Sequence, residues 1–147
     1  MVAVFYDEIS AAFEFVSAAP PIEHSAYISL DTGQIFWTSE LASMDQELPD
    51  DIGTSDRYLS VPHKNELDLG KNLSLRFAAR ELADSYGRVQ AMFRSKGAYR
   101  RFKELLEDKG LLDRWYQFEA REKEEALRAW CAENGICIIE SGEQRET

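Results

Sequence analysis

The sequence has little of several residue types, and each shortage narrows the range of functions. Only two histidines occur in 147 residues, and they do not have the one-turn spacing of a metal-binding helix. Cys131 and Cys137 are the two cysteines; they match no metal-ligand pattern and stand in apolar surroundings. We therefore expect no metal and no cofactor, and we expect both cysteines to be buried, reduced thiols.

Long hydrophobic runs are also missing. No apolar stretch approaches the roughly 20 residues that a membrane-spanning helix requires. The first residues, MVAVFYDEIS, lack the basic start of a signal peptide. These absences predict a cytoplasmic protein with no membrane partner. The G-x-S-x-G motif of many hydrolases is absent as well, and no other set of nucleophile, base and orienting group is recognisable, so we expect no enzyme.

Two short motifs resemble catalytic ones but lack the context that the chemistry needs. Asp31-Thr32-Gly33 spells the aspartic-protease triplet, yet it lies between two strand-like segments, where Asp and Gly are typical turn residues. Gly70-Lys71 lacks the remainder of a phosphate-binding loop. His24 and His63 are expected at the surface, although Glu66 or Asp68 beside His63 leaves a shared site open.

What the chain does have is apolar residues and acidic charge. Hydrophobic residues make up 44% of it, enough for a core, and 27 acidic against 17 basic residues give a net charge of -10. We expect a single domain over residues 1–141 followed by a polar tail, 142–147. The net charge disfavours nucleic acid as a partner without excluding it.

The hydrophobic spacing predicts an α+β fold with strands early and helices late. A helix over 7–18 precedes a hairpin at 25–30 and 34–38, a third strand at 57–61, and an apolar C-terminal strand at 136–139. We expect these strands to form one small, mostly antiparallel sheet covered on one face by four to five helices. The acidic stretch 40–56 is expected to be a solvated loop, since it lacks calcium-loop spacing. The later helices are marked by Leu73, Phe77 and Leu82; by Val89, Met92 and Phe93; by Phe102, Leu105 and Leu106; and by the stripe from Leu112 to Cys131.

The basic segment, Arg88 to Lys103, is the strongest functional signal. Its sequence, RVQAMFRSKGAYRRFK, carries six cations and no acid, with aromatic residues between them. Cations beside aromatic rings can hold nucleic acid or a nucleotide, and a helix that begins near Gly97 offers free amide groups to an anion. The candidate anion- or partner-binding residues are Arg94, Lys96, Arg100 and Arg101.

Two interpretations of this segment stay open. Its arginines can pair with carboxylates of the last helix, such as Glu119, Glu122 and Glu125, or stay solvated, and this is the more common outcome for a charge run. Otherwise the cations form a site. Phe93 and Phe102 lie on the apolar faces of their helices, so we expect both in the core.

Three motifs in the second half of the chain resemble those of an uncharacterised bacterial protein family. They are the segment Gly97 to Lys103 (GAYRRFK), the pair Trp115-Tyr116, and the segment Trp130 to Ile136 (WCAENGI). The hairpin from Tyr27 to Phe36 is similar to the opening of the same family. The resemblance implies a bacterial or phage origin and a cytoplasmic protein, and it implies no activity.

The sequence favours two function classes over an enzyme. The first is a binding or regulatory module that holds an anionic ligand, RNA or, above all, an acidic protein partner on the basic helix start. The second is an acidic interaction protein, such as an inhibitor or antitoxin-like nucleic-acid mimic, whose carboxylates occupy a basic protein. A homodimer that joins the basic face of one copy to the acidic face of another is compatible with either.

Overall fold

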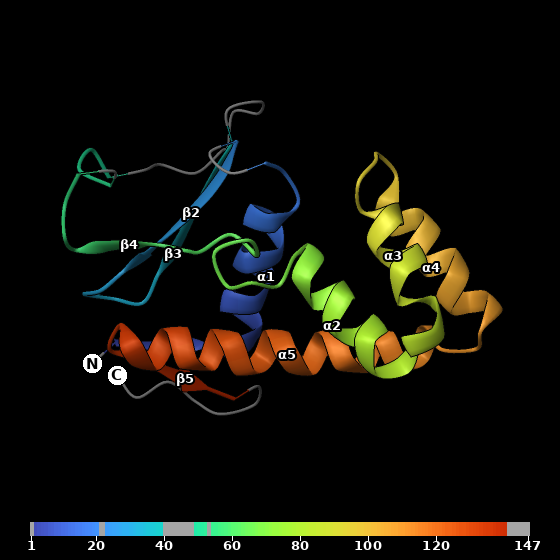
Figure 1. Ribbon diagram of the computed structural model, residues 1–147. Helices are drawn as coiled ribbons and strands as arrows, with labels where there is room; N and C mark the ends of the chain where they lie inside the picture. Colours follow the sequence, from blue (N-terminus) through green and yellow to red (C-terminus); the bar gives the residue numbers. More distant parts are fainter. Residues whose placement is uncertain (1, 21–22, 40–48, 53, 141–147) are drawn as a thin grey trace. The chain divides into compact units, whose positions relative to one another are not determined.

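The computed structural model describes residues 2–20, 23–39, 49–52 and 54–140, and their architecture is the expected α+β (Figure 1). Five α-helices and two sheets occur in this part of the chain. In chain order the elements are β1 (Val2–Phe5), α1 (Tyr6–Ser17), β2 (His24–Ser29), β3 (Ile35–Ser39), β4 (Tyr58–Ser60), α2 (Lys71–Glu81), a 3₁₀ turn (Ala83–Ser85), α3 (Tyr86–Met92), α4 (Ala98–Asp108), α5 (Leu112–Glu133) and β5 (Ile136–Ile139).

The chain divides into two compact units. Unit 1 comprises Met1–Leu67 together with Glu125–Thr147, and unit 2 comprises Asp68–Glu124. Unit 1 therefore contains all five strands and α1, whereas α2, α3 and α4 belong to unit 2. Helix α5 contributes its first residues to unit 2 and its last to unit 1. The expectation of one domain over residues 1–141 stays a prediction.

Unit 1 is built on the predicted hairpin. Strand β2 lies between β3 and β4 and pairs antiparallel with both, so that Tyr27 is opposite Phe36 on one side and Ser60 on the other. Helix α1 packs against β2 and β3. It buries Ile9, Phe13 and Val16, whose helical spacing predicts a helix over 7–18, and it buries Ala12 as well.

The C-terminal strand lies elsewhere than expected. Strand β5 does not join the antiparallel sheet but pairs in parallel with β1, from Val2 opposite Ile136 to Phe5 opposite Ile139. The sequence did not predict β1, because four apolar residues directly before a helix carry no period of their own. Within β5 the ends are buried while Cys137 is exposed, so the prediction of a buried thiol is wrong for Cys137.

Unit 2 is a helical body with an aromatic core. The Trp115 ring, only 1% exposed, lies edge-on to Phe77 and Phe102 at centroid distances of 5.4 and 5.1 Å. Phe118 is tilted against Phe77 at 5.4 Å, and Phe93 against Phe102 at 5.8 Å. As expected, Phe102 is fully buried, while Phe93 is half-buried. Edge-on and tilted pairs are the favoured aromatic geometries, so this core holds α2 through α5 of the unit together.

Parts of two predictions fall outside the described residues, namely most of the acidic stretch 40–56 and the tail. The described part of that stretch forms turns around Asp51, whose carbonyl accepts hydrogen bonds from the amides of Thr54 and Ser55. No helix within the described ranges is long and apolar enough to cross a bilayer.

Candidate functional site

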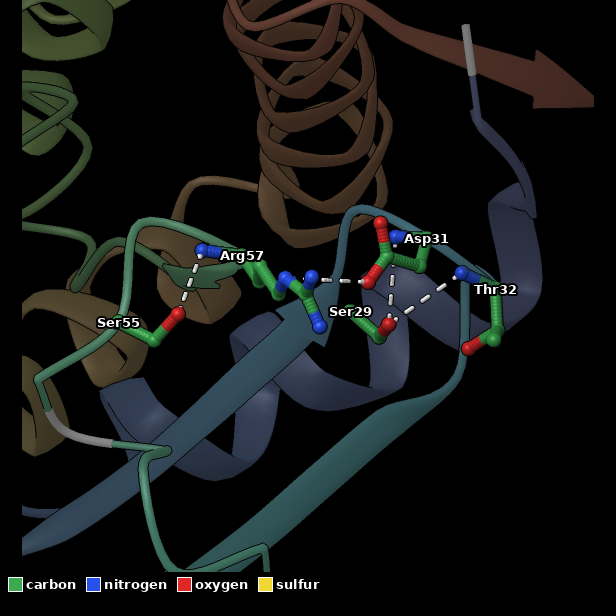
Figure 2. Close-up of polar contacts among 5 residues, drawn as sticks. All are labelled: Ser29, Asp31, Thr32, Ser55 and Arg57. Atoms are coloured by element: carbon green, nitrogen blue, oxygen red, sulfur yellow. Dashed lines mark hydrogen bonds and ion pairs between the residues drawn. The ribbon is translucent and has the colours of Figure 1, made fainter.

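The Asp31-Thr32-Gly33 triplet is a structural turn, as predicted (Figure 2). The Ser29 hydroxyl accepts hydrogen bonds from the amides of Asp31 and Thr32 at 3.3 and 3.2 Å, and the Gly33 amide donates to the Ser29 carbonyl at 2.8 Å. The Asp31 carboxylate is exposed and lies 3.8 Å from the Arg57 Nε. Its role is therefore a surface ion pair that joins the hairpin turn to the residue before β4.

Gly33 makes this turn possible in two ways. Its φ of +80° is a conformation that residues with a side chain rarely adopt. A Cβ at this position would also lie 2.4 Å from the Ala3 carbonyl oxygen, so the turn touches the backbone of β1. The hairpin and the parallel pair are thus in direct contact through a glycine.

His63 is buried, contrary to the expectation of a surface residue. Only 5% of it is exposed, and its Nε2 lies 2.9 Å from the carbonyl oxygen of Ala19. Its Nδ1 lies 3.1 Å from the Asn65 amide. Because a backbone amide is always a donor, Nδ1 accepts and Nε2–H donates, which identifies the tautomer that fits both contacts. Glu66 binds the backbone amide of His63 at 3.0 Å and not its ring, so the pair forms no catalytic dyad.

His24 and Cys131 likewise pack within the folded chain. His24 is half-buried; its Nδ1 lies 2.8 Å from the Phe15 carbonyl, and its ring stacks on the Phe15 ring at 4.4 Å. Cys131 is fully buried, as predicted, and burial raises the pKa of its thiol to about 11. Within the described ranges, no group of three or more His, Cys, Asp or Glu residues could hold a metal ion.

The basic segment forms the end of α3, a turn, and the start of α4. Helix α3 ends at Met92, Gly97 takes a positive φ of +76°, and α4 begins at Ala98. The Arg101 guanidinium folds back over this turn, donating to the Ser95 hydroxyl and to the Lys96 carbonyl, both at 2.7 Å. Arg101 therefore shapes the turn, and its donors are partly occupied by the protein itself.

The other cations of the segment are exposed, and three of them are unpaired. Arg88, Arg94 and Lys96 make no ion pair with any residue in the described ranges. Arg100 lies 3.5 Å from Glu104, one turn along α4, and this pair is highly exposed. Lys103 lies over the Tyr116 ring at 5.7 Å. Pairing with carboxylates of the last helix is thus not the state of these cations.

The aromatic rings of the segment point into unit 2 and contact one another. Tyr99 lies edge-on to Phe93 at 5.3 Å, and it is half-buried. Burial raises the pKa of Tyr99 above its ordinary value; the nearby Ser74 side chain lowers it in part, and the Glu119 carboxylate raises it further. These rings are occupied by the core, so they do not form an open platform for stacking nucleobases.

The two units carry formal charges of opposite sign. Unit 2 carries 13 Lys and Arg residues against 10 Asp and Glu, a formal charge of +3, whereas the residues of unit 1 carry 4 against 17, a charge of -13. The sequence showed the local excess in the basic segment but not the extent of unit 2. The whole-chain charge of -10 therefore hides a positively charged body.

Two clefts contain residues that the sequence did not single out. In unit 1 a cleft of about 670 Å³ is lined by the start of α1, the hairpin turn and β3, and neither of its carboxylates is without a partner. In unit 2 a smaller cleft of about 150 Å³ carries three arginines from α2 and α5. The unit 1 cleft is lined by Asp7, Glu8, Ala11, Thr32, Gln34, Ile35 and Trp37.

Only some of the residues that line the unit 2 cleft could be grouped from the sequence. Arg114, Gln117 and Arg121 share one helical face by their spacing, which is a usable signal. Arg80, which also lines the cleft, lies more than thirty positions earlier and is brought to these residues only by folding.

Comparison with protein-family models, curated proteins and solved structures finds no match to this chain.

Proposed function

We propose that unit 2 is a non-enzymatic binding module that holds an acidic protein partner on its basic face, defined as Arg94, Lys96, Arg100 and Arg101. The observation that carries the proposal is that Arg94 and Lys96, beside the first turn of α4, are exposed and make no ion pair within the described part of the chain. No acidic residue occupies that turn. Cations at a helix N-terminus oppose the helix dipole, so this arrangement costs stability that an anionic partner would recover.

The four residues differ in their roles under this proposal. Arg94 and Lys96 supply the charge that meets the partner, and Arg100 can exchange its exposed pair with Glu104 for a partner carboxylate. Arg101 holds the turn that presents them. A protein partner is favoured over nucleic acid because Phe93 and Tyr99 are packed on each other and so offer no open ring on which a nucleobase could stack.

The test compares two charge-matched double variants in full-length protein. Arg94→Glu with Lys96→Glu reverses the basic face. Lys71→Glu with Lys109→Glu makes the same change in net charge at two exposed residues of unit 2, one at the start of α2 and one beyond the end of α4. Fluorescence anisotropy with a labelled polyglutamate peptide, at about 50 and about 300 mM salt, measures binding and its screening.

We expect the basic-face variant to lose at least about tenfold in affinity, since two charge pairs are removed and replaced by repulsion. The control variant should lose less than about threefold. Equal losses in both variants would show a response to net charge alone and would overturn the proposal. Stronger binding to a single-stranded oligonucleotide than to the peptide would indicate that the basic face binds nucleic acid instead of a protein.

A second function is favoured by the charge of -13 on the residues of unit 1. Under this alternative the acidic surface occupies a basic protein, and exposed carboxylates such as Asp50 and Asp51 provide the contacts. Asp50→Asn with Asp51→Asn should then weaken binding of a labelled polylysine peptide, while Arg94→Glu with Lys96→Glu should leave it unchanged or stronger. The reverse pattern excludes this alternative.

A further inference from the structure

A cleft on unit 2, separate from the basic face, has the composition of an anion site. Its volume is about 150 Å³, and it lies where residues of α2 meet residues of α5. This is below the roughly 300–1,000 Å³ of pockets that enclose a drug-sized ligand, so it has room for one small group. The lining residues are Phe77, Arg80, Glu81, Arg114, Gln117, Phe118 and Arg121.

One carboxylate organises two of the three arginines. Glu81 is largely buried, with 17% of its side chain exposed. One of its oxygens lies 3.8 Å from the Arg80 Nε, and the other lies 3.2 Å from an Arg114 terminal nitrogen. Because Glu81 uses both oxygens, it holds guanidinium groups from two helices near one another and limits their rotamers. Their remaining N–H donors make no other hydrogen bond within the described residues.

The third arginine has no ion pair with any described residue. The Arg121 guanidinium lies over the Phe118 ring, 5.9 Å from its centroid. Three guanidinium groups against one carboxylate leave two excess positive charges around the cleft. The Phe77 and Phe118 side chains, 2% and 8% exposed, provide an apolar base that strengthens electrostatic attraction relative to open water.

We propose that this cleft binds a phosphoryl group as its dianion. The two excess charges match the charge of a phosphate monoester near neutral pH, and planar guanidinium groups donate in pairs to phosphoryl oxygens. The Gln117 amide adds a neutral donor at the same edge. The phosphoryl group can come from a small molecule or from a phosphorylated side chain of a partner, since both present the same terminal oxygens.

The site is independent of the proposed function, because the cleft and the basic face share no residue. The test titrates full-length protein with inorganic phosphate, and separately with a phosphoserine peptide and its unphosphorylated form, by calorimetry at constant ionic strength. Arg121→Gln is the informative variant, since Arg121 is exposed and makes no ion pair in the described ranges, so its loss should not disturb folding. Arg76→Gln, which removes an exposed arginine paired with Asp68 outside the cleft, is the control.

We expect phosphate to bind wild-type protein and Arg76→Gln equally, and Arg121→Gln to lose about tenfold or more in affinity, because a charge-assisted bidentate contact is lost. Gln117→Glu should abolish binding by adding a negative charge. The Trp115 indole N–H signal in NMR spectra should shift on titration, since its ring contacts Phe77 and Phe118. Phosphate affinity that is unaffected by Arg121→Gln, or no phosphate binding to wild type, would overturn the proposal.

The two sources give different results in the same experiment. Peptide binding much tighter than that of inorganic phosphate, lost in the unphosphorylated form, identifies a phosphorylated protein. Equal affinities identify a small phosphorylated molecule. Arg94→Glu with Lys96→Glu should leave phosphate binding in the cleft intact, so failure of either proposal is recognised separately.

Discussion

Gly33→Ala is the substitution whose cost can be worked out most directly from the structure. Gly33 has a φ of +80°, and an alanine in this region of backbone conformation costs about 1–2 kcal/mol. The new methyl group would also lie 2.4 Å from the Ala3 carbonyl oxygen and 3.2 Å from a Val2 methyl carbon. The first contact is with backbone, which β1 cannot shift freely because it is paired with β5.

The two effects add to a large loss of stability. Relieving such overpacking costs roughly 1–3 kcal/mol, which brings the expected decrease in the free energy of unfolding to about 2–5 kcal/mol. A domain is stable by about 5–15 kcal/mol, so a substantial share would be lost. With a urea m-value of about 1–3 kcal/mol/M, the midpoint should fall by about 1 M or more.

Gly135→Ala is the matched control in the same unit. Gly135 has nearly the same φ, +73°, but nothing lies within 4 Å of the position of its Cβ. It should therefore lose only the conformational term, about 1–2 kcal/mol. Urea unfolding followed by circular dichroism measures both variants. Equal losses would refute the close approach of the turn to β1, because only that contact distinguishes the two glycines.

Three further predictions concern His63 and the two cysteines. His63→Ala should lower the free energy of unfolding by about 2–4 kcal/mol, since it removes two hydrogen bonds and a buried ring. His24→Ala, at a half-buried residue, should lower it clearly less. Similar losses for the two variants in urea titrations would contradict the structural role of the buried His63 ring. In native protein one thiol, Cys137, should react quickly with a thiol reagent and Cys131 only after unfolding; two fast thiols would contradict the burial of Cys131. The pKa of Cys131 is raised from 9.0 to about 11 in the folded protein, so its stabilising contribution is complete below about pH 9 and is lost as the pH rises toward about 11. The free energy of unfolding of wild type should therefore fall by up to about 3 kcal/mol more than that of Cys131→Ala over this range, and parallel curves would contradict the shift.

The sequence predicted those elements whose signal is local. The spacing of Leu73 and Phe77, and the turn residues Asp31 to Gly33, lie within a few positions of one another, and both α2 and the β2–β3 hairpin formed as expected. Strand β1 was missed because its evidence is its partner β5, more than 130 positions away. The start of a helix near Gly97 was predicted, but the hydrogen bonds of Arg101 to the turn before that helix were not.

The burial of His63 was also not predictable from nearby residues in the sequence. His63 stands between the apolar Val61-Pro62 and the polar run from Lys64 to Glu66, so its neighbours in the sequence do not decide its burial. Its ring contacts the Ala19 carbonyl, 44 positions earlier. The arginine cleft depends likewise on Glu81 joining Arg80 to Arg114. Side chains that depend on contacts between distant segments carry no period or motif, so only the folded chain identifies them.

The parallel pairing of β1 with β5 has a consequence for the order in which this chain can fold during synthesis. Val2–Phe5 is synthesised before its partner Ile136–Ile139, and nearly all of the described chain lies between the two strands. Unit 2 is drawn from one continuous stretch, so it can close while the later residues are still being made. The apolar β1 segment therefore waits without its strand partner while the intervening residues are made, and an unpaired apolar strand is a site of aggregation.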